Sequence, residues 1–389
     1  MFFKLLKDAL KVKNVRNKIL FTIFIIFVFR VGTHVTVPGI NAESLKQLSD
    51  LPFLNMLNLV SGNAMNNFSI FSMGVSPYIT ASIIVQLLQM DIYPKFVEWG
   101  KQGEVGRRKL NQATRYITLV LAFVQSIGIT ASFNTLSSIS LVKTPNVSTY
   151  LLIGTILTAG SIIVTWLGEQ ITDKGFGNGV SMIIFSGIIA SIPKMFSTIY
   201  EDFFVNVRSG ELTRSYIIVA LLIVVGLAIV FFTTFVQQAE YQIPIQYTKL
   251  VQGAPTSSYL PLKVNPAGVI PVIFASSITT IPSTILPFFS KVTWLSHLQG
   301  LLSYNTPSGM ITYAILIILF SFFYTFVQVN PEKTAENLQK NGSYIPSVRP
   351  GRETEKYMSS LLKRLATIGA VFLAFISLAP IAAQQFMHL

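Results

Sequence analysis

Cysteine is absent from this 389-residue sequence, and charged residues are scarce. Without cysteine, the chain can form neither disulfides nor thiolate metal sites. Charged residues make up 12% of the sequence and hydrophobic residues 51%, whereas soluble domains carry about 25% charged residues. The three histidines, His34, His297 and His388, show no metal-ligand spacing. The composition therefore excludes an ordinary soluble domain and indicates a membrane protein.

Long apolar segments recur along the whole chain. A helix needs about 20 mostly apolar residues to cross a bilayer. Nine segments approach this length, and they lie at residues 19–37, 74–90, 114–134, 149–168, 179–199, 215–236, 267–288, 309–329 and 365–386. The pattern predicts an all-α, multi-pass membrane protein.

The basic residues indicate an orientation, because lysine and arginine near span ends favour the cytoplasm. With a cytoplasmic N-terminus, 22 of the 29 lysines and arginines fall on cytoplasmic segments. Residues 1–18 suit a short amphipathic arm at the membrane surface. The concentrated positive charge either sets topology alone or also docks an acidic partner, such as ribosomal RNA or a motor protein.

Catalytic and ion-coupling groups are missing from the predicted spans. All sixteen carboxylates fall outside the membrane centre, where proton-coupled pumps usually keep ionisable groups. The spans contain no HExxH motif, no aspartate pair and no histidine beside a serine. We therefore expect no enzymatic activity and no cofactor. Arg30 lies in the first span, and we expect it to reach the membrane interface from the helix end.

The stretch from Ser61 to Gln89 combines a membrane helix with an irregular segment rich in serine, asparagine and glycine. Backbone groups within hydrocarbon must be hydrogen-bonded internally, so an irregular segment at membrane depth cannot face lipid. We therefore expect protein to enclose it. The apolar piece before it, residues 52–67, is too short to span and suits a short helix folded back into a cavity.

Five stretches, distributed in order along the chain, carry a specific resemblance. They are SGNAMNNFSIFSMGVSPYITASIIVQLL, GEVGRRKLNQATRY, WLGEQITDKGFGNGVSMIIF, LPLKVNPAGVIPVIFASSI and NPEKTAENLQKNGSYIPSVRPGRETEKY. Together they resemble the SecY family, the channel subunits of the bacterial Sec protein translocase. The resemblance covers nearly the whole chain.

The resemblance implies an α-helical channel built from two inverted-repeat halves. The halves would be residues 19–199, with spans 1–5, and residues 200–389, with spans 6–9 and the cytoplasmic loops 237–266 and 330–364. The family has a tenth span, so nine of the usual ten are present and we expect the natural protein to be longer.

The resemblance also assigns functional residues. The apolar pore ring would comprise Val75, Ile79, Val180, Ile184 and Ile273. The plug, residues 52–67, would include Leu54, Met56, Leu57, Gly62 and Met65. The polar seam of a lateral gate, between spans 2 and 3 and spans 7 and 8, would include Thr80, Gln125 and Asn265. Docking of the SecA ATPase and the ribosome would involve Arg107, Arg108, Lys109, Lys249, Arg349 and Arg352.

The function implied is export of unfolded polypeptides across the bacterial cytoplasmic membrane, with lateral release of membrane segments into lipid. SecE-like and SecG-like subunits, SecA, the ribosome, signal peptides and nascent polypeptides are the implied partners. Two other functions stay open. A secondary transporter is also built from inverted repeats with broken helices, but it needs a compact polar site at the midplane. A non-conducting insertase would share the lateral seam without needing a ring and plug.

Overall fold

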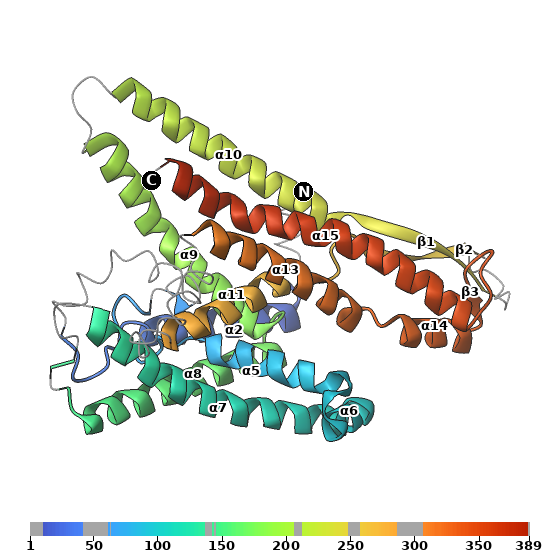
Figure 1. Cartoon of the computed structure of the whole chain (residues 1–389), viewed down its shortest axis with the longest axis horizontal. Coiled ribbons are helices and arrows are strands. Elements are labelled where there is room, and N and C mark those ends of the chain that lie inside the picture. Colours follow the sequence, from blue (N-terminus) through green and yellow to red (C-terminus); the bar gives the residue numbers. More distant parts are fainter. Residues whose placement is uncertain are drawn as a thin grey trace. The chain divides into compact units, whose positions relative to one another are not determined.

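The computed structural model describes residues 11–41, 61–62, 64–136, 142–143, 145–205, 212–247, 257–285 and 306–387. The chain divides into two compact units. The first covers Met1–Asn206 and Ser283–Val292, and the second covers Val207–Pro282 and Thr293–Leu389. Each unit is described by itself, and Figure 1 labels their helices and strands.

The first unit is helical. Its elements are α2 (Lys13–Gly32), α5 (Ser76–Leu87), the π-helical turn η1 (Leu88–Ile92), α6 (Pro94–Lys101), α7 (Gly103–Leu136), α8 (Val147–Lys174), α9 (Gly179–Tyr200) and the π-helical turn η2 (Glu201–Val205). Proline in the first turn favours the starts of α5 and α6. Asn178 caps α9 by accepting from the Ser181 N–H.

The irregular segment before α5 is enclosed by protein, as its composition predicts. Residues 64–75 form successive turns, and nearly all of them are buried. The Ile70 N–H donates to the Val35 carbonyl at 2.9 Å, and the Val37 N–H donates to the Phe68 carbonyl at 3.0 Å. The Ser72 hydroxyl donates to the Ala64 carbonyl at 3.0 Å. These bonds satisfy backbone groups that lipid could not satisfy.

An apolar cluster holds this segment in the core of the first unit. Its buried members are Val37, Met65, Phe68, Met73, Ile129, Val142, Ile153 and Leu157. They come from the segment after α2, the turns before α5, helices α7 and α8, and, with Val142, the connection between those two helices. Burial of these side chains anchors the irregular segment in the core of the unit.

The second unit combines long helices with a small sheet. Its elements are α10 (Leu212–Gln238), β1 (Glu240–Tyr247), β2 (Ser257–Lys263), α11 (Ile270–Ile285), α13 (Pro307–Gln328), α14 (Pro331–Lys340), β3 (Ser343–Tyr344) and α15 (Arg352–Met387). The strands are antiparallel in the order β2-β1-β3, with Ile243 opposite Leu260 and Gln246 opposite Tyr344.

The two predicted cytoplasmic loops fold into this sheet and α14, which lie together at one end of α15 in Figure 1. A second apolar cluster supports them, with Ile243, Leu262, Ile345, Met358, Leu362 and Leu365 buried. Residues 237–266 and 330–364 were expected to be loops, so their strands and the helix α14 differ from the expectation.

Nine helices coincide with the nine predicted spans. Within the described residues, six of them are long and apolar enough to cross a membrane, namely those in Gly103–Ala131, Val147–Lys174, Gly179–Val205, Ser215–Gln238, Pro307–Lys340 and Arg352–Ala382. The other three are α2, which carries basic residues at both ends, and the shorter α5 and α11. The chain is a multi-pass membrane protein.

The boundary of the predicted N-terminal arm needs correction. The arm was expected at residues 1–18, ahead of the first span. Instead, α2 begins at Lys13 and continues without a break to Gly32, so the basic residues from Lys13 to Lys18 are part of the same helix. Residues 1–10 lie outside the described part of the chain.

Candidate channel site

Two of the predicted ring residues lie where the irregular segment meets α5. Val75 is the residue before the helix, and Ile79 lies one turn later, its N–H donating to the Val75 carbonyl at 3.0 Å. Both side chains are buried. The preceding Gly74 has a φ of +52°, a conformation that glycine adopts without strain. Its carbonyl accepts from the Ser161 hydroxyl of α8 at 3.0 Å.

Close packing against α8 fixes the same junction. A Cβ atom placed on Gly160 would lie 1.8 Å from the Ile70 carbonyl oxygen. No side chain could fit there without moving the backbone, so Gly160 permits the turns before Val75 to touch α8 directly. Gly160 and Ser161 are neighbours in the sequence, and together they position the start of α5.

Two further ring residues, Val180 and Ile184, lie on one face in the first turns of α9, and both are partly buried. The start of α9 also packs on a glycine of α8. A Cβ atom on Gly179 would lie 1.8 Å from the Gly168 carbonyl oxygen, and one on Gly168 would lie 3.3 Å from Val180 Cγ2. Nothing in the sequence indicated this contact between the two glycines.

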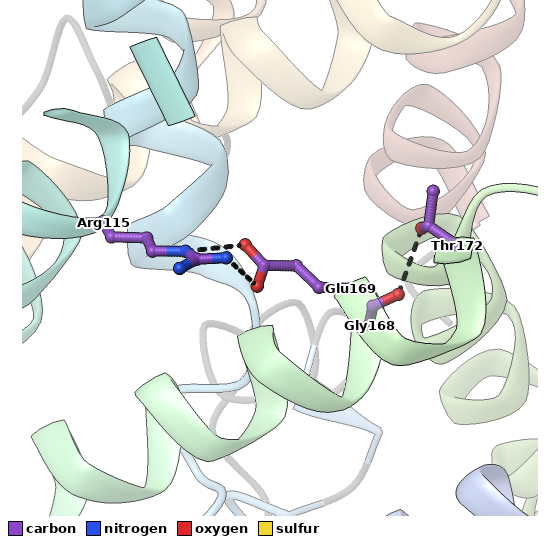
Figure 2. A network of polar contacts seen from close by, with 4 residues as sticks. All are labelled: Arg115, Gly168, Glu169 and Thr172. Carbon is purple, nitrogen blue, oxygen red and sulfur yellow. Dashed lines mark hydrogen bonds and ion pairs between the residues drawn. The ribbon is translucent and has the colours of Figure 1, made fainter. Parts of the chain in front are cut away.

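A polar network secures the α8–α9 turn. The Thr172 hydroxyl accepts from the Gly179 N–H at 2.8 Å and donates to the Gly168 carbonyl at 3.1 Å. Beside it, Arg115 of α7 binds Glu169 through two hydrogen bonds, Nε to Oε1 at 3.1 Å and Nη2 to Oε2 at 2.6 Å. Figure 2 shows these two contacts of α8 next to each other. The network links Arg115, in the first half of α7, to the residue preceding Val180.

The fifth predicted ring residue, Ile273, belongs to the second unit. It lies in the first turn of α11, is partly buried, and its N–H donates to the Val269 carbonyl at 3.3 Å. The structure therefore groups the predicted ring into two pairs in the first unit and one residue in the second.

The predicted gate residues are all buried polar groups. Thr80 of α5 donates to the Ser76 carbonyl at 3.2 Å, and Gln125 lies in α7, which packs against α5. In the second unit, the Asn265 side chain donates to the Gly268 carbonyl at 3.1 Å, which stabilises the turn before α11. Its Oδ1 atom is buried without a hydrogen-bond partner. A buried acceptor without a partner is costly, so a new hydrogen-bond donor at this place would stabilise it.

Of the predicted plug residues, Gly62 and Met65 are described and both are buried. Met65 belongs to the apolar cluster of the first unit. The Gly62 carbonyl accepts from Arg30 Nη1 of α2 at 2.7 Å. Leu54, Met56 and Leu57 lie outside the described residues.

Comparison with known proteins assigns the family. The family model for SecY matches residues 69–389. The chain belongs to the SecY family. It is 71% identical over 393 residues to the protein translocase subunit SecY of Streptococcus gordonii, covering all of this chain and 90% of that relative.

Two solved structures share the fold of this SecY-family chain at 15% identity. One is described as a protein-conducting channel and superposes with a TM-score of 0.62, over 93% of this chain and 84% of that one. The other superposes with a TM-score of 0.61 over the same shares, and it is described as showing that the SecY plug domain stabilises the closed state of the translocation channel. The fold is therefore that of a SecY-like channel.

The residues predicted to dock partners of this SecY-family chain are exposed wherever they are described. Arg107, Arg108 and Lys109 lie in the first turns of α7, where Lys109 Nζ stands 6.0 Å from the centre of the Trp99 ring. Arg349 and Arg352 lie between β3 and the first turn of α15. Lys249 is outside the described residues. The described side chains form two basic surfaces, one in each unit.

Proposed function

We propose that the chain forms the protein-conducting channel of a Sec translocon in the bacterial cytoplasmic membrane, with its N-terminus in the cytoplasm. It moves unfolded secretory polypeptides outward and releases membrane segments sideways into lipid. It is not an enzyme. The single observation that carries this proposal is the enclosed irregular segment before α5. A helix that only crosses the membrane needs no such segment, whereas a channel can use one to line its interior.

The five ring residues give this channel its seal. An apolar constriction excludes water and ions by dewetting. Aliphatic side chains also fit a passing chain of any sequence, because they make no directional bonds with it. The residues of the ring in the first unit are held by backbone contacts with α8, so their positions do not depend on the polypeptide in transit.

The buried polar groups suit a lateral gate at Thr80, Gln125 and Asn265. Hydrogen bonds between helices in membranes are worth about 1 kcal/mol each, so a seam built from them separates readily. The unpartnered Asn265 Oδ1 atom supports this assignment. Hydrophobic transfer of a signal peptide or membrane segment into lipid then supplies the free energy of sideways release.

The basic surfaces suit acidic partners. Arg107, Arg108 and Lys109 in the first unit, and Arg349 and Arg352 in the second, are exposed. We assign these surfaces to SecA and to the ribosome, whose RNA is polyanionic. The exposed apolar side chains of α10 leave a helix face for lipid or for SecE-like and SecG-like subunits.

Ion conductance of the full protein tests the proposal. The chain would be reconstituted with its SecE-like subunit in a planar bilayer, intact and with residues 52–67 deleted. We expect a large, flickering conductance after the deletion, because nothing then blocks the ring from outside. If both forms stay silent while substrates still insert into the membrane, the chain is a lateral insertase and has no axial pore.

A further inference from the structure

Arg30 is a charged residue inside the first span, and its side chain has an internal partner. The sequence led us to expect a side chain that reaches the membrane interface. The guanidinium instead donates to the Gly62 carbonyl at 2.7 Å and is half-buried. A charge within a span is costly unless it is paired, so a paired charge there indicates a function.

Gly62 occupies a tight position between two helices. Its φ is +69°, and a Cβ atom on it would lie 3.0 Å from Gly187 Cα of α9 and 3.4 Å from the Phe29 ring and Arg30 Nη1 of α2. Only glycine fits this conformation and this space without strain. Gly187 follows the ring residue Ile184 by three residues, so the Gly62 backbone lies close to the helix that carries the ring.

The chain after Gly62 is held without help from Arg30. Phe71 stacks on Phe29 of α2 with ring centres 5.9 Å apart. The Ile70 N–H donates to the Val35 carbonyl, and the apolar cluster buries Met65 and Phe68. The last residues of the predicted plug, from Ala64 on, share these contacts, and the rest of the plug precedes Gly62 in the chain. In the described part of the chain, the bond from Arg30 is therefore a polar contact that holds the plug ahead of these residues, at Gly62.

We propose that Arg30 is a positioning residue for channel gating. Its guanidinium holds the plug at the Gly62 carbonyl, ahead of the residues that the apolar cluster buries, and the bond is released when the channel opens. A charge-assisted hydrogen bond is about twice as strong as a neutral one. Because the acceptor is a backbone carbonyl, the bond depends on where the plug sits and not on its side chains. The gating role rests on the proposed channel function.

The absence of cysteine permits a direct test. Ser61 is buried and its hydroxyl has no hydrogen-bond partner, so Ser61→Cys is a mild substitution that reports exposure of this point. The rate of N-ethylmaleimide labelling would be measured in membranes containing the full chain with its SecE-like subunit. Arg30→Gln and Arg30→Lys would be compared with Arg16→Gln, which alters an exposed arginine of the same helix. A second reporter, Ser126→Cys in the buried face of α7, measures general loosening.

We expect Arg30→Gln to speed labelling of Ser61→Cys roughly ten- to hundredfold, as follows from losing a hydrogen bond to a charged group. Arg30→Lys should give a smaller rise, and Arg16→Gln none. Equal rates for Arg30→Gln and the parent, or an equal rise at the Ser126→Cys reporter, would overturn the proposal. If the Arg30→Gln protein does not accumulate in the membrane, the labelling rate of Arg30→Lys is compared with that of the parent instead, and equal rates would again overturn the proposal.

Release on opening has its own measurement. A precursor stalled in the channel should raise Ser61→Cys labelling of the parent toward the Arg30→Gln rate. Labelling that stays at the resting rate would contradict release. Because labelling requires no transport, the two proposals fail differently. If Arg30→Gln leaves labelling unchanged while deletion of residues 52–67 raises conductance, only the proposed role of Arg30 fails. If labelling rises with Arg30→Gln but deletion of residues 52–67 gives no conductance, the channel proposal fails, and the gating role fails with it.

Discussion

Replacing Gly160 with alanine tests the enclosure of the irregular segment. The new Cβ atom would lie 1.8 Å from the Ile70 carbonyl oxygen and 2.7 Å from the carbonyl carbon, whereas ordinary contact begins at 3.4 Å. The obstructing atoms are backbone, so no side-chain rotation relieves the clash. The turns before α5 must move away from α8 by more than 1 Å, and this shift strains the Ser161–Gly74 hydrogen bond beside it.

The cost follows from these contacts. Overpacking of a core costs about 1–3 kcal/mol, and a buried group that loses its hydrogen bond costs about 1–3 kcal/mol. Alanine recovers about 1 kcal/mol of helix propensity over glycine. We therefore expect Gly160→Ala to lower the free energy of unfolding by about 1–5 kcal/mol. Unfolding by SDS titration, followed by far-ultraviolet circular dichroism, measures this difference.

Gly226→Ala in α10 is the matched control. It makes the same substitution in another apolar helix, and nothing lies within 4 Å of the new Cβ atom. We expect it to be neutral or to stabilise by up to about 1 kcal/mol. The same change in free energy for both variants would refute the reasoning, because the contact between Gly160 and Ile70 would then carry no weight.

Three other predictions concern the ring and its supports. Ile184→Asn should raise ion leakage through the closed channel, and Ile189→Asn, at an exposed position of the same helix, should not. Arg115→Ala should cost about 0.5–1 kcal/mol of unfolding free energy, because the pair is bidentate but its side chains are 60% and 21% exposed. The double variant Arg115→Glu with Glu169→Arg should recover part of that loss. Thr172→Val should cost about 1 kcal/mol by leaving the Gly179 N–H without its acceptor.

Hydropathy predicted the helices but not how they pack. The spans can be predicted from local composition, because each needs about 20 consecutive, mostly apolar residues. The contact between Ile70 and Gly160 joins positions 90 residues apart, and both read as ordinary apolar residues of their segments. Glycine spacing alone does not say which glycine meets which backbone. The enclosure was predictable in kind, from the backbone's need for partners, and not in its details.

The sheet of the second unit shows a different failure. Pro244 and Pro261 make strands hard to recognise in this sequence, because proline within a sheet is confined to edge strands and bulges. The structure reconciles them with a sheet, because β3 pairs with β1 only at Gln246 and Tyr247. Pro244 therefore lies where β1 has one neighbouring strand. The alternation that buries Ile243 and Ile245 beside exposed Gln242 and Pro244 was the signal that could have revealed it.

The two ring pairs of the first unit share one device on α8. Val75 and Val180 each follow a glycine, Gly74 or Gly179, and each of these glycines is hydrogen-bonded by a hydroxyl of α8. Near each hydroxyl bond, a glycine permits direct backbone contact with α8: Gly160 of α8 meets the Ile70 carbonyl, and Gly179 of α9 meets the Gly168 carbonyl of α8. One helix, α8, thus fixes the backbone positions from which both pairs of ring residues project. A seal built in this way can yield at its side chains as a polypeptide passes, while the positions from which those side chains project stay fixed.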